Sequence, residues 1–166
     1  GSNRVIPARV TFENGEIGIV FGNYSLPTPT ASIQPELMAL NESCAIMSYY
    51  GRNNIITAVA GCLTGDEDMN MVWGPIYEYS DDYIFHDIVG LSSNKFIVAH
   101  AREPWWYDEN VDVYDRQLHP ENYPKPTDST IHYGLGTVYD NLTLSVGEIK
   151  QIKKDSFGFM DMARYE

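Results

Sequence analysis

Residues 87–102 read D-I-V-G-L-S-S-N-K-F-I-V-A-H-A-R, and this stretch decides the fold. Two apolar runs rich in strand-forming residues flank a polar turn, which is the pattern of a β-hairpin. An imperfect copy begins at Glu36 with E-L-M-A-L-N-E-S-C-A-I-M-S-Y-Y-G. A more divergent copy begins at Ile149 with I-K-Q-I-K-K-D-S-F-G-F-M-D-M-A-R. The chain is therefore predicted to be an internal repeat organised around hairpins.

The spacing of the three copies indicates that the hairpin keeps its length while the connection before it varies. Leu40 and Leu91 are 51 residues apart, whereas Leu91 and Ile152 are 61 apart. Phe96 and Phe157 are also 61 apart, so the third copy is in register with the second. We expect Leu40, Leu91 and Ile152 to occupy equivalent places in three successive antiparallel sheets.

Two glycine motifs recur in step with the hairpins. The sequence G-C-L at 61–63 matches G-T-V at 136–138, and W-G at 73–74 matches F-G at 21–22 and V-G at 146–147. Each unit is therefore predicted to have four strands. They are expected at 8–12, 17–22, 36–40 and 44–50, then 57–63, 69–77, 87–91 and 96–101, and finally 131–138, 142–146, 149–153 and 157–163. The units span about residues 5–52, 53–103 and 130–166, with a long insertion at 104–129.

Composition is that of a folded, single-domain β protein. The chain has 166 residues, of which 43% are hydrophobic and 13% aromatic, with 12 tyrosines. Helical spacing is weak throughout, and no apolar run approaches the roughly 18 residues of a membrane helix. Asn14-Gly15 is typical of a tight hairpin turn. The prolines between 24 and 35 predict a surface loop or an edge strand.

Strand-turn-strand units of about 50 residues with these glycine strands and the L-S-S-N-K-F-I-V-A hairpin resemble the blades of β-propeller repeat proteins. The resemblance covers most of the chain and matches no particular propeller family. It implies four-stranded antiparallel blades. Propellers use four to eight blades, whereas three fit here, so the chain is either part of a larger ring or associates with copies to close one. An open β-sandwich and a stacked β-solenoid are the alternatives.

The net charge of −12 narrows the classes of partner. Nucleic-acid phosphates and anionic membrane surfaces both require Lys and Arg, so neither is expected as a partner. Cations and basic proteins remain compatible with this charge.

Two cysteines are too few for a disulfide framework or a zinc cluster. For Cys44 and Cys62 the sequence favours buried free thiols over a disulfide. Sequons at Asn23, Asn41 and Asn141 slightly favour a secreted or extracellular protein.

The insertion 104–129 is the predicted recognition segment, because long insertions in repeat proteins often form the binding face. It carries large amphipathic rings beside carboxylates, and the candidate binding residues are Trp105, Trp106, Tyr107, Asp108 and Tyr114. Such rings anchor protein interfaces and stack on sugars. The alternative is that the tryptophans pack back over the core.

Two acidic clusters could supply oxygen ligands to Ca²⁺, the only cofactor considered. They contain Asp66, Glu67 and Asp68 in one turn, and Asp112 and Asp115 in the insertion. Neither has the spacing of a helix-loop-helix calcium site. A solvated turn is the competing interpretation for the first cluster.

The histidines show no metal-binding or catalytic spacing, and no nucleophile or phosphate motif accompanies them. His100 lies at the position that Tyr49 holds in the first copy, which predicts a strand residue at an interface between units.

Three classes of function follow. The first is a non-enzymatic interaction or self-assembling protein, with a homo-oligomer as the expected partner state. The second is a secreted glycan-binding or calcium-binding module. The third is a propeller-type enzyme whose carboxylates meet only on folding.

Overall fold

The computed structural model describes residues 4–27, 33–50, 55–65, 69–80, 85–102 and 130–153. The regular structure in these ranges consists of twelve strands, and every strand pairing is antiparallel. The all-β prediction is confirmed. The same ranges contain no helix long and apolar enough to cross a membrane.

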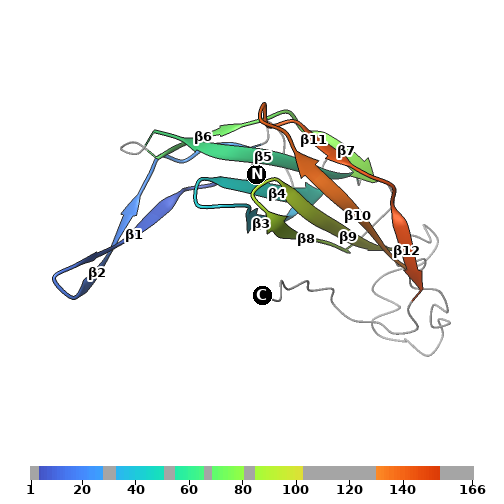
Figure 1. The fold of residues 1–166 in the computed structure, drawn as a ribbon, viewed down its shortest axis with the longest axis horizontal. Helices are drawn as coiled ribbons and strands as arrows, with labels where there is room; N and C mark the ends of the chain where they lie inside the picture. The colour runs from blue at the N-terminus through green and yellow to red at the C-terminus, as the bar shows by residue number, and fades with distance from the viewer. Residues whose placement is uncertain are drawn as a thin grey trace, which may run out of the picture.

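The strands form one two-stranded ribbon and two five-stranded sheets (Figure 1). The ribbon consists of β1 (Ala8–Glu13) and β2 (Glu16–Phe21). Sheet I consists of β3 (Ile33–Ala39), β4 (Cys44–Tyr50), β5 (Ile56–Thr64), β6 (Asn70–Trp73) and β7 (Tyr77–Ser80). Sheet II consists of β8 (Phe85–Ser92), β9 (Lys95–Arg102), β10 (Thr130–Val138), β11 (Leu144–Val146) and β12 (Lys150–Lys153).

Sheets I and II have the same topology. Sheet I runs β3-β4-β5-β6, with β7 also paired to β5, and sheet II runs β8-β9-β10-β11, with β12 also paired to β10. Gly61 pairs with Ala45 in sheet I, and Gly136 pairs with Phe96 in sheet II. The expected equivalence of the first two hairpins, and of the two glycine strands, is confirmed by this register.

One local arrangement occurs three times along the chain. In each copy a strand pairs with a neighbouring strand that is followed by a glycine. The N–H of this glycine donates a hydrogen bond to a backbone carbonyl of the first strand. The bonds run from Gly22 to Pro7, from Gly74 to Ala60 and from Gly147 to Leu135. The chain then pairs with the same strand again, at Val5↔Ser25, Ala58↔Tyr77 and Tyr133↔Lys150. The ribbon is therefore equivalent to the pair β5 and β6 in sheet I and to the pair β10 and β11 in sheet II.

The predicted grouping into three four-stranded sheets is wrong, because each hairpin bonds to the strands that follow it. Sheet I joins β3 and β4 to β5, and β2 pairs only with β1 among the described residues. Ile152 is not equivalent to Leu91, because it pairs with Ile131 in β12 beside β10. Residues 157–163, the last predicted strand, lie outside the described residues. In the described part of the chain no closed or propeller arrangement is found.

Local sequence signals explain the turns. Asn14 and Gly15 have φ of 53° and 83°, as a two-residue hairpin turn with right-handed strand twist requires. Pro35 lies in β3, the edge strand of sheet I, where the register with β4 is interrupted between Ile33 and Glu36. Proline lacks an N–H, so this edge position is one of the few that a sheet tolerates.

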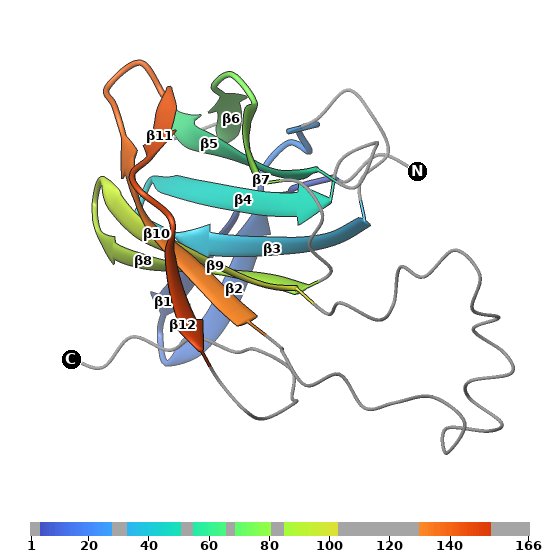
Figure 2. The ribbon, with the colours of Figure 1, turned by 90° about the vertical axis from the view of Figure 1, so that its right-hand side faces the viewer.

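Sheet I lies between sheet II and the N-terminal segment, and side chains that alternate along β4 contact one or the other. Ile46 belongs to a core shared with Ile88 and Phe96 of sheet II. Met47 faces the other way and packs with Val5 of the N-terminal segment. In Figure 2 the strands of sheet II run obliquely across those of sheet I. Cover on both faces explains why β4 and β5 are nearly continuous apolar runs.

Candidate interaction surface

The residues predicted to bind ligands lie outside the described residues. They are Trp105, Trp106, Tyr107, Asp108 and Tyr114 for binding, and Asp66, Glu67, Asp68, Asp112 and Asp115 for Ca²⁺. Their roles stay predictions. Among the described residues no group of three or more His, Cys, Asp or Glu side chains is placed to hold a metal ion.

The structure does locate both ends of the predicted insertion. Arg102 at the end of β9 pairs with Thr130 at the start of β10. At the corresponding end of sheet I, Tyr50 pairs with Ile56 across the short connection from β4 to β5. The insertion therefore replaces a short hairpin connection, and its two ends meet on adjacent strands.

The ribbon carries a continuous row of exposed apolar side chains. Because side chains alternate across a strand, one face of the ribbon carries only apolar residues. We call it the front face, and its residues are Ala8, Val10, Phe12, Ile17, Ile19 and Phe21. Phe12 and Phe21 are 74% and 68% exposed, and Val10, Ile17 and Ile19 are also more than half exposed. Contiguous apolar patches of this kind mark interaction sites.

The opposite face of the ribbon is mainly polar, with Arg9, Thr11, Glu13 and Glu16 around Gly18 and Val20. The ribbon projects from the two sheets at one end of the molecule (Figure 1). An isolated two-stranded hairpin is marginally stable in water and needs a covered apolar face. The front face therefore has the composition of a core surface and the exposure of an outer surface.

The outer edge of β1 offers backbone hydrogen-bonding groups as well. Val5 exchanges hydrogen bonds with Ser25, and Pro7 accepts one from Gly22. In antiparallel pairs alternate residues bond to the same neighbour, so Ala8 and Val10 direct their N–H and C=O groups to the opposite edge. In sheets I and II the corresponding edges of β5 and β10 are paired with β4 and β9. Among the described strands, β2 alone pairs with β1.

The root of the ribbon is anchored to sheet I. The Trp73 indole N–H donates to the Ser25 hydroxyl at 2.8 Å, and Val5 packs against the cluster of Met47, Tyr49 and Val59. These contacts fix where the ribbon leaves the body and in which direction its front face points.

A second feature is a row of three histidines across sheet II. His100 pairs with His86 of β8 on one side and with His132 of β10 on the other. Because directly opposed residues share a face, the three imidazoles form a ladder on the face that meets sheet I. The His86 ring is edge-on to Tyr50 at 5.3 Å between centroids, and the His100 ring lies 6.2 Å from that of Tyr79. His100 thus faces the neighbouring sheet, as predicted from its alignment with Tyr49.

Burial keeps His86 and His100 of this row neutral at pH 7. Desolvation, followed by repulsion from His132 and His86, lowers the pKa of His100 to about 4. Burial also lowers the pKa of His86, although the nearby Ser48 backbone and the charge of Asp87 partly oppose this shift. Burial raises the pKa of Tyr79, whose hydroxyl is hydrogen-bonded to Ser48 at 2.9 Å. The row suits a packed interface between sheets better than proton transfer at neutral pH.

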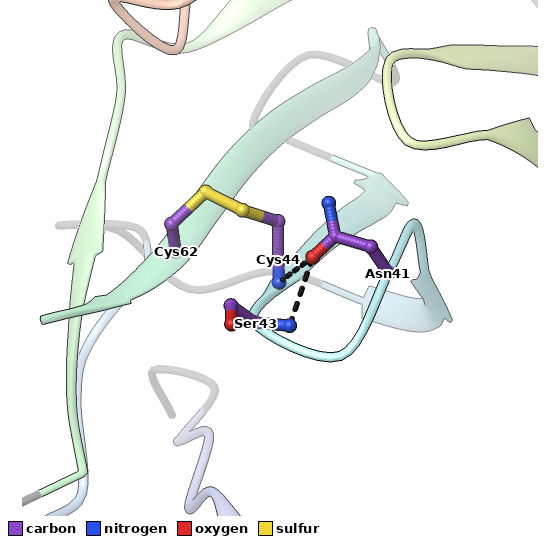
Figure 3. Close-up of a disulfide and its surroundings, with 4 residues drawn as sticks. All are labelled: Asn41, Ser43, Cys44 and Cys62. Carbon is purple, nitrogen blue, oxygen red and sulfur yellow. Dashed lines mark hydrogen bonds between the residues drawn. A yellow bond between two sulfur atoms is a disulfide. The ribbon is translucent and has the colours of Figure 1, made fainter. Parts of the chain in front are cut away.

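Cys44 and Cys62 form a disulfide, so the prediction of free thiols is wrong (Figure 3). They are directly opposed on β4 and β5, and their Cα atoms are 4.1 Å apart. Cross-strand pairs that share no backbone hydrogen bonds come this close. The Asn41 side chain accepts hydrogen bonds from the N–H groups of Ser43 and Cys44, which fixes the turn leading into β4.

The equivalent pair in sheet II is Lys95 and Thr137. The Lys95 ammonium donates to the Thr137 hydroxyl at 2.7 Å, so a polar contact replaces the covalent bond at the same register. This position therefore links neighbouring strands in both sheets by different chemistry.

Replacing both Cys44 and Cys62 by alanine should lower the free energy of unfolding by about 3 kcal/mol, because the bond closes a short loop in the unfolded chain. The sequence separation of the two cysteines is 18. For a chain of this size, thermal unfolding should shift down by roughly 6–12 °C. Dithiothreitol should cause a similar shift in the wild type and none in the double variant. Two titratable thiols in the untreated native protein would contradict the bond.

A shallow cleft of about 360 Å³ lies where the turns of the two sheets meet, near the disulfide. Leu40, Asn41, Asn94, Tyr139 and Asp140 are among the residues that line it. The described residues of its lining include one carboxylate and no histidine, so they offer no acid–base pair.

Comparison with protein families, curated proteins and solved structures finds no match to this chain.

Proposed function

We propose that this protein is a non-enzymatic interaction module built from β-repeats, and that it self-associates through the ribbon. The observation that carries the proposal is the exposed front face, where Phe12 and Phe21 are the most exposed large apolar side chains of the described residues. Burying apolar surface contributes roughly 25 cal/mol per Å², so covering this face by a second molecule is strongly favourable. The adjacent edge of β1 adds backbone groups that can extend a sheet.

The recurring strand arrangement supports the same proposal. We interpret the ribbon, sheet I and sheet II as three blade-like units. Among the described residues the ribbon has no hairpin like those that β3 with β4 and β8 with β9 provide to the two sheets. Repeat units gain most of their stability from their neighbours, so the uncovered side of the ribbon offers a surface for another molecule. An open ring or stack would be completed by association.

The test is sedimentation velocity at tens of micromolar protein, where the wild type should be oligomeric. Ile19→Asp places a charge on the front face and should weaken association by at least about 2 kcal/mol, or roughly 30-fold in Kd. Val20→Asp is the matched control, because Val20 is the next residue and is also exposed but lies on the opposite face.

A wild type that sediments only as a monomer would refute self-association. Equal weakening by both variants would show that the front face is not the contact. Circular dichroism on each variant separates loss of association from loss of folding.

A secreted recognition module is the second candidate. The Cys44–Cys62 disulfide favours an oxidising compartment, and the sequon residues Asn23, Asn41 and Asn141 are exposed. In this proposal the insertion 104–129 is the recognition segment. Glycan and Ca²⁺ are its candidate ligands.

A further inference from the structure

We infer that Asn141 carries an N-linked glycan and that the first sugar of this glycan stacks on the ring of Tyr139. The sequon N-L-T at 141–143 is one of three in the chain. Three observations distinguish it: the conformation of its turn, the hydrogen bonds of its asparagine, and an exposed aromatic ring beside it. The inference concerns the turn between β10 and β11 and is independent of the self-association proposed for the ribbon.

The turn between β10 and β11 has a conformation that three-residue hairpin loops commonly adopt. The Leu142 N–H donates to the Tyr139 carbonyl at 2.8 Å, and the Tyr139 N–H donates to the Thr143 carbonyl at 3.0 Å. Leu142 has φ of 63°, the left-handed conformation that follows a type I turn in such loops. A Cβ on Gly74 would overlap Leu142, so the absence of a side chain there lets the turn pack against sheet I. These contacts determine how the side chains of the turn are placed.

The Asn141 side chain is arranged as an acceptor for glycosylation. Its carbonyl oxygen accepts hydrogen bonds from Thr143, at 2.6 Å from the hydroxyl and 3.1 Å from the N–H. Both bonds are local, so they can form before the rest of the chain folds. Among the described residues the amide nitrogen has no hydrogen-bond partner, and Asn141 is exposed. The nitrogen can therefore carry a bulky group at the surface.

Glycosylation joins Asn141 Nδ2 to C1 of the first sugar of a lipid-linked oligosaccharide. The bond from C1 to the diphosphate of this donor breaks, the lipid diphosphate leaves, and Nδ2 gives up a proton. Asn141 keeps its carbonyl oxygen in the product, so both hydrogen bonds from Thr143 can persist. The Cys44–Cys62 disulfide favours an oxidising compartment, the environment in which secreted chains receive such glycans.

Tyr139 supplies a surface for the first sugar. Its ring is 51% exposed, and its hydroxyl is hydrogen-bonded to Ser145 at 3.2 Å, which orients the ring. An open hollow of about 510 Å³ is lined by Tyr139, Asp140, Asn141 and Thr143. A sugar attached to Asn141 begins in this hollow beside the ring, where its C–H groups can pack on the ring face. Such packing removes apolar surface of both groups from water.

The sequon at Asn23 differs in its hydrogen bonds. An aromatic residue, Phe21, also stands two positions before it, but the Asn23 amide nitrogen donates to the Asn70 side chain at 3.0 Å. The hydroxyl of Ser25, the last residue of this sequon, accepts the indole N–H of Trp73. Both polar groups of the sequon are therefore used within the fold.

The sequon at Asn41 forms a turn but has no aromatic platform. Its side chain accepts hydrogen bonds from the backbone N–H groups of Ser43 and Cys44, and the residue two positions before it is Ala39. A glycan at Asn41 would gain no stacking of this kind.

Peptide mass spectrometry of the protein from its natural source tests the modification. Release of N-linked glycans by an amidase converts each occupied asparagine to aspartate. We expect this conversion at Asn141 and not at Asn23. An unmodified Asn141 would overturn the inference.

A thermodynamic cycle tests the stacking. Wild type and Tyr139→Ala are each secreted from eukaryotic cells with the glycan and produced in a bacterial periplasm without it. The glycan should raise the thermal unfolding temperature of the wild type by roughly 2–4 °C more than that of Tyr139→Ala, the effect of one aromatic contact in a chain of this size. Tyr139→Phe is the matched control, because it keeps the ring and loses only the hydroxyl, and it should respond as the wild type does.

Equal responses of the wild type and Tyr139→Ala to the glycan would overturn the stacking. A response of Tyr139→Phe equal to that of Tyr139→Ala would also overturn it, because the ring is then not the group that matters. None of these measurements depends on the ribbon variants, so the glycan and the self-association can fail separately.

Discussion

Replacing Phe96 by alanine should lower the free energy of unfolding by about 3–5 kcal/mol, the usual cost of removing a buried aromatic side chain. Phe96 is fully buried at the centre of the core shared by sheets I and II. Its ring lies against Gly136 of the neighbouring strand. Urea unfolding followed by tryptophan fluorescence measures the loss, which should be close to the largest that one core substitution produces in this protein.

A double-mutant cycle sharpens this prediction. A methyl group on Gly136 would overlap the Phe96 ring, so Gly136→Ala should cost about 1–3 kcal/mol in the wild type. In the Phe96→Ala background the ring is gone, and the same substitution should be nearly neutral or stabilising.

Gly61→Ala is the control for that cycle. Gly61 occupies the equivalent position in sheet I, but there the ring that covers it belongs to Trp73. Its cost should therefore be independent of residue 96. Additive effects of Phe96→Ala and Gly136→Ala would contradict the packing described here.

Acidification from pH 7 to pH 4 should destabilise the protein through the histidine row. The pKa of His100 is about 4 in the folded protein, whereas the ordinary pKa of a histidine, which applies to the unfolded chain, is 6.5. Between these values the unfolded chain binds a proton that the folded chain excludes, so stability is complete above about pH 6.5 and falls as the pH approaches 4. His100 alone accounts for on the order of 3 kcal/mol, at 1.36 kcal/mol per pKa unit. His86, whose pKa is also lowered, acts in the same direction.

The internal repeat provides the matched variant for this pH dependence. Tyr49 and Thr57 occupy the positions in sheet I that His100 and His132 occupy in sheet II. Substituting His100→Tyr and His132→Thr together should flatten the dependence between pH 6.5 and 4, measured by urea unfolding at each pH. An unchanged slope in the double variant would place the titrating group elsewhere.

The strands could be predicted from the sequence because their signals are local. The hairpin at 87–102 and the turn at Asn14-Gly15 each combine apolar runs with a specific turn, and both were found at those places. One run, 69–77, is two strands, because the chain crosses from β6 to β7 at Gly74. A short interruption of this kind has little effect on hydrophobic patterning.

The grouping of strands into sheets could not be predicted in the same way. A sequence period gives the spacing of equivalent residues, such as Leu40 and Leu91, but it does not say where one sheet ends and the next begins. The pairing of β4 with β5 settles that question, since it places each hairpin before its partner strands. The predicted equivalence of Ile152 with Leu40 and Leu91 is wrong for this reason.

The disulfide and the histidine row depend on the same information. Once β4 and β5 are known to be neighbours, Cys44 falls opposite Cys62. Once β9 is known to lie between β8 and β10, His100 falls between His86 and His132. The residues are separated in sequence, so no short motif reveals them. The front face of the ribbon did have a signal, the alternating apolar residues on both sides of Asn14-Gly15, but alternation alone does not tell a covered face from an exposed one.

The pairing of Arg102 with Thr130 has an evolutionary consequence. Both ends of the insertion are held by β9 and β10, and a short connection joins the equivalent strands β4 and β5 in sheet I, so the length and sequence of the insertion can change without disturbing the register of either sheet. Lengthening a loop adds only slowly to its entropic cost. The two sheets can therefore keep their structure while the segment between β9 and β10 changes in length and sequence.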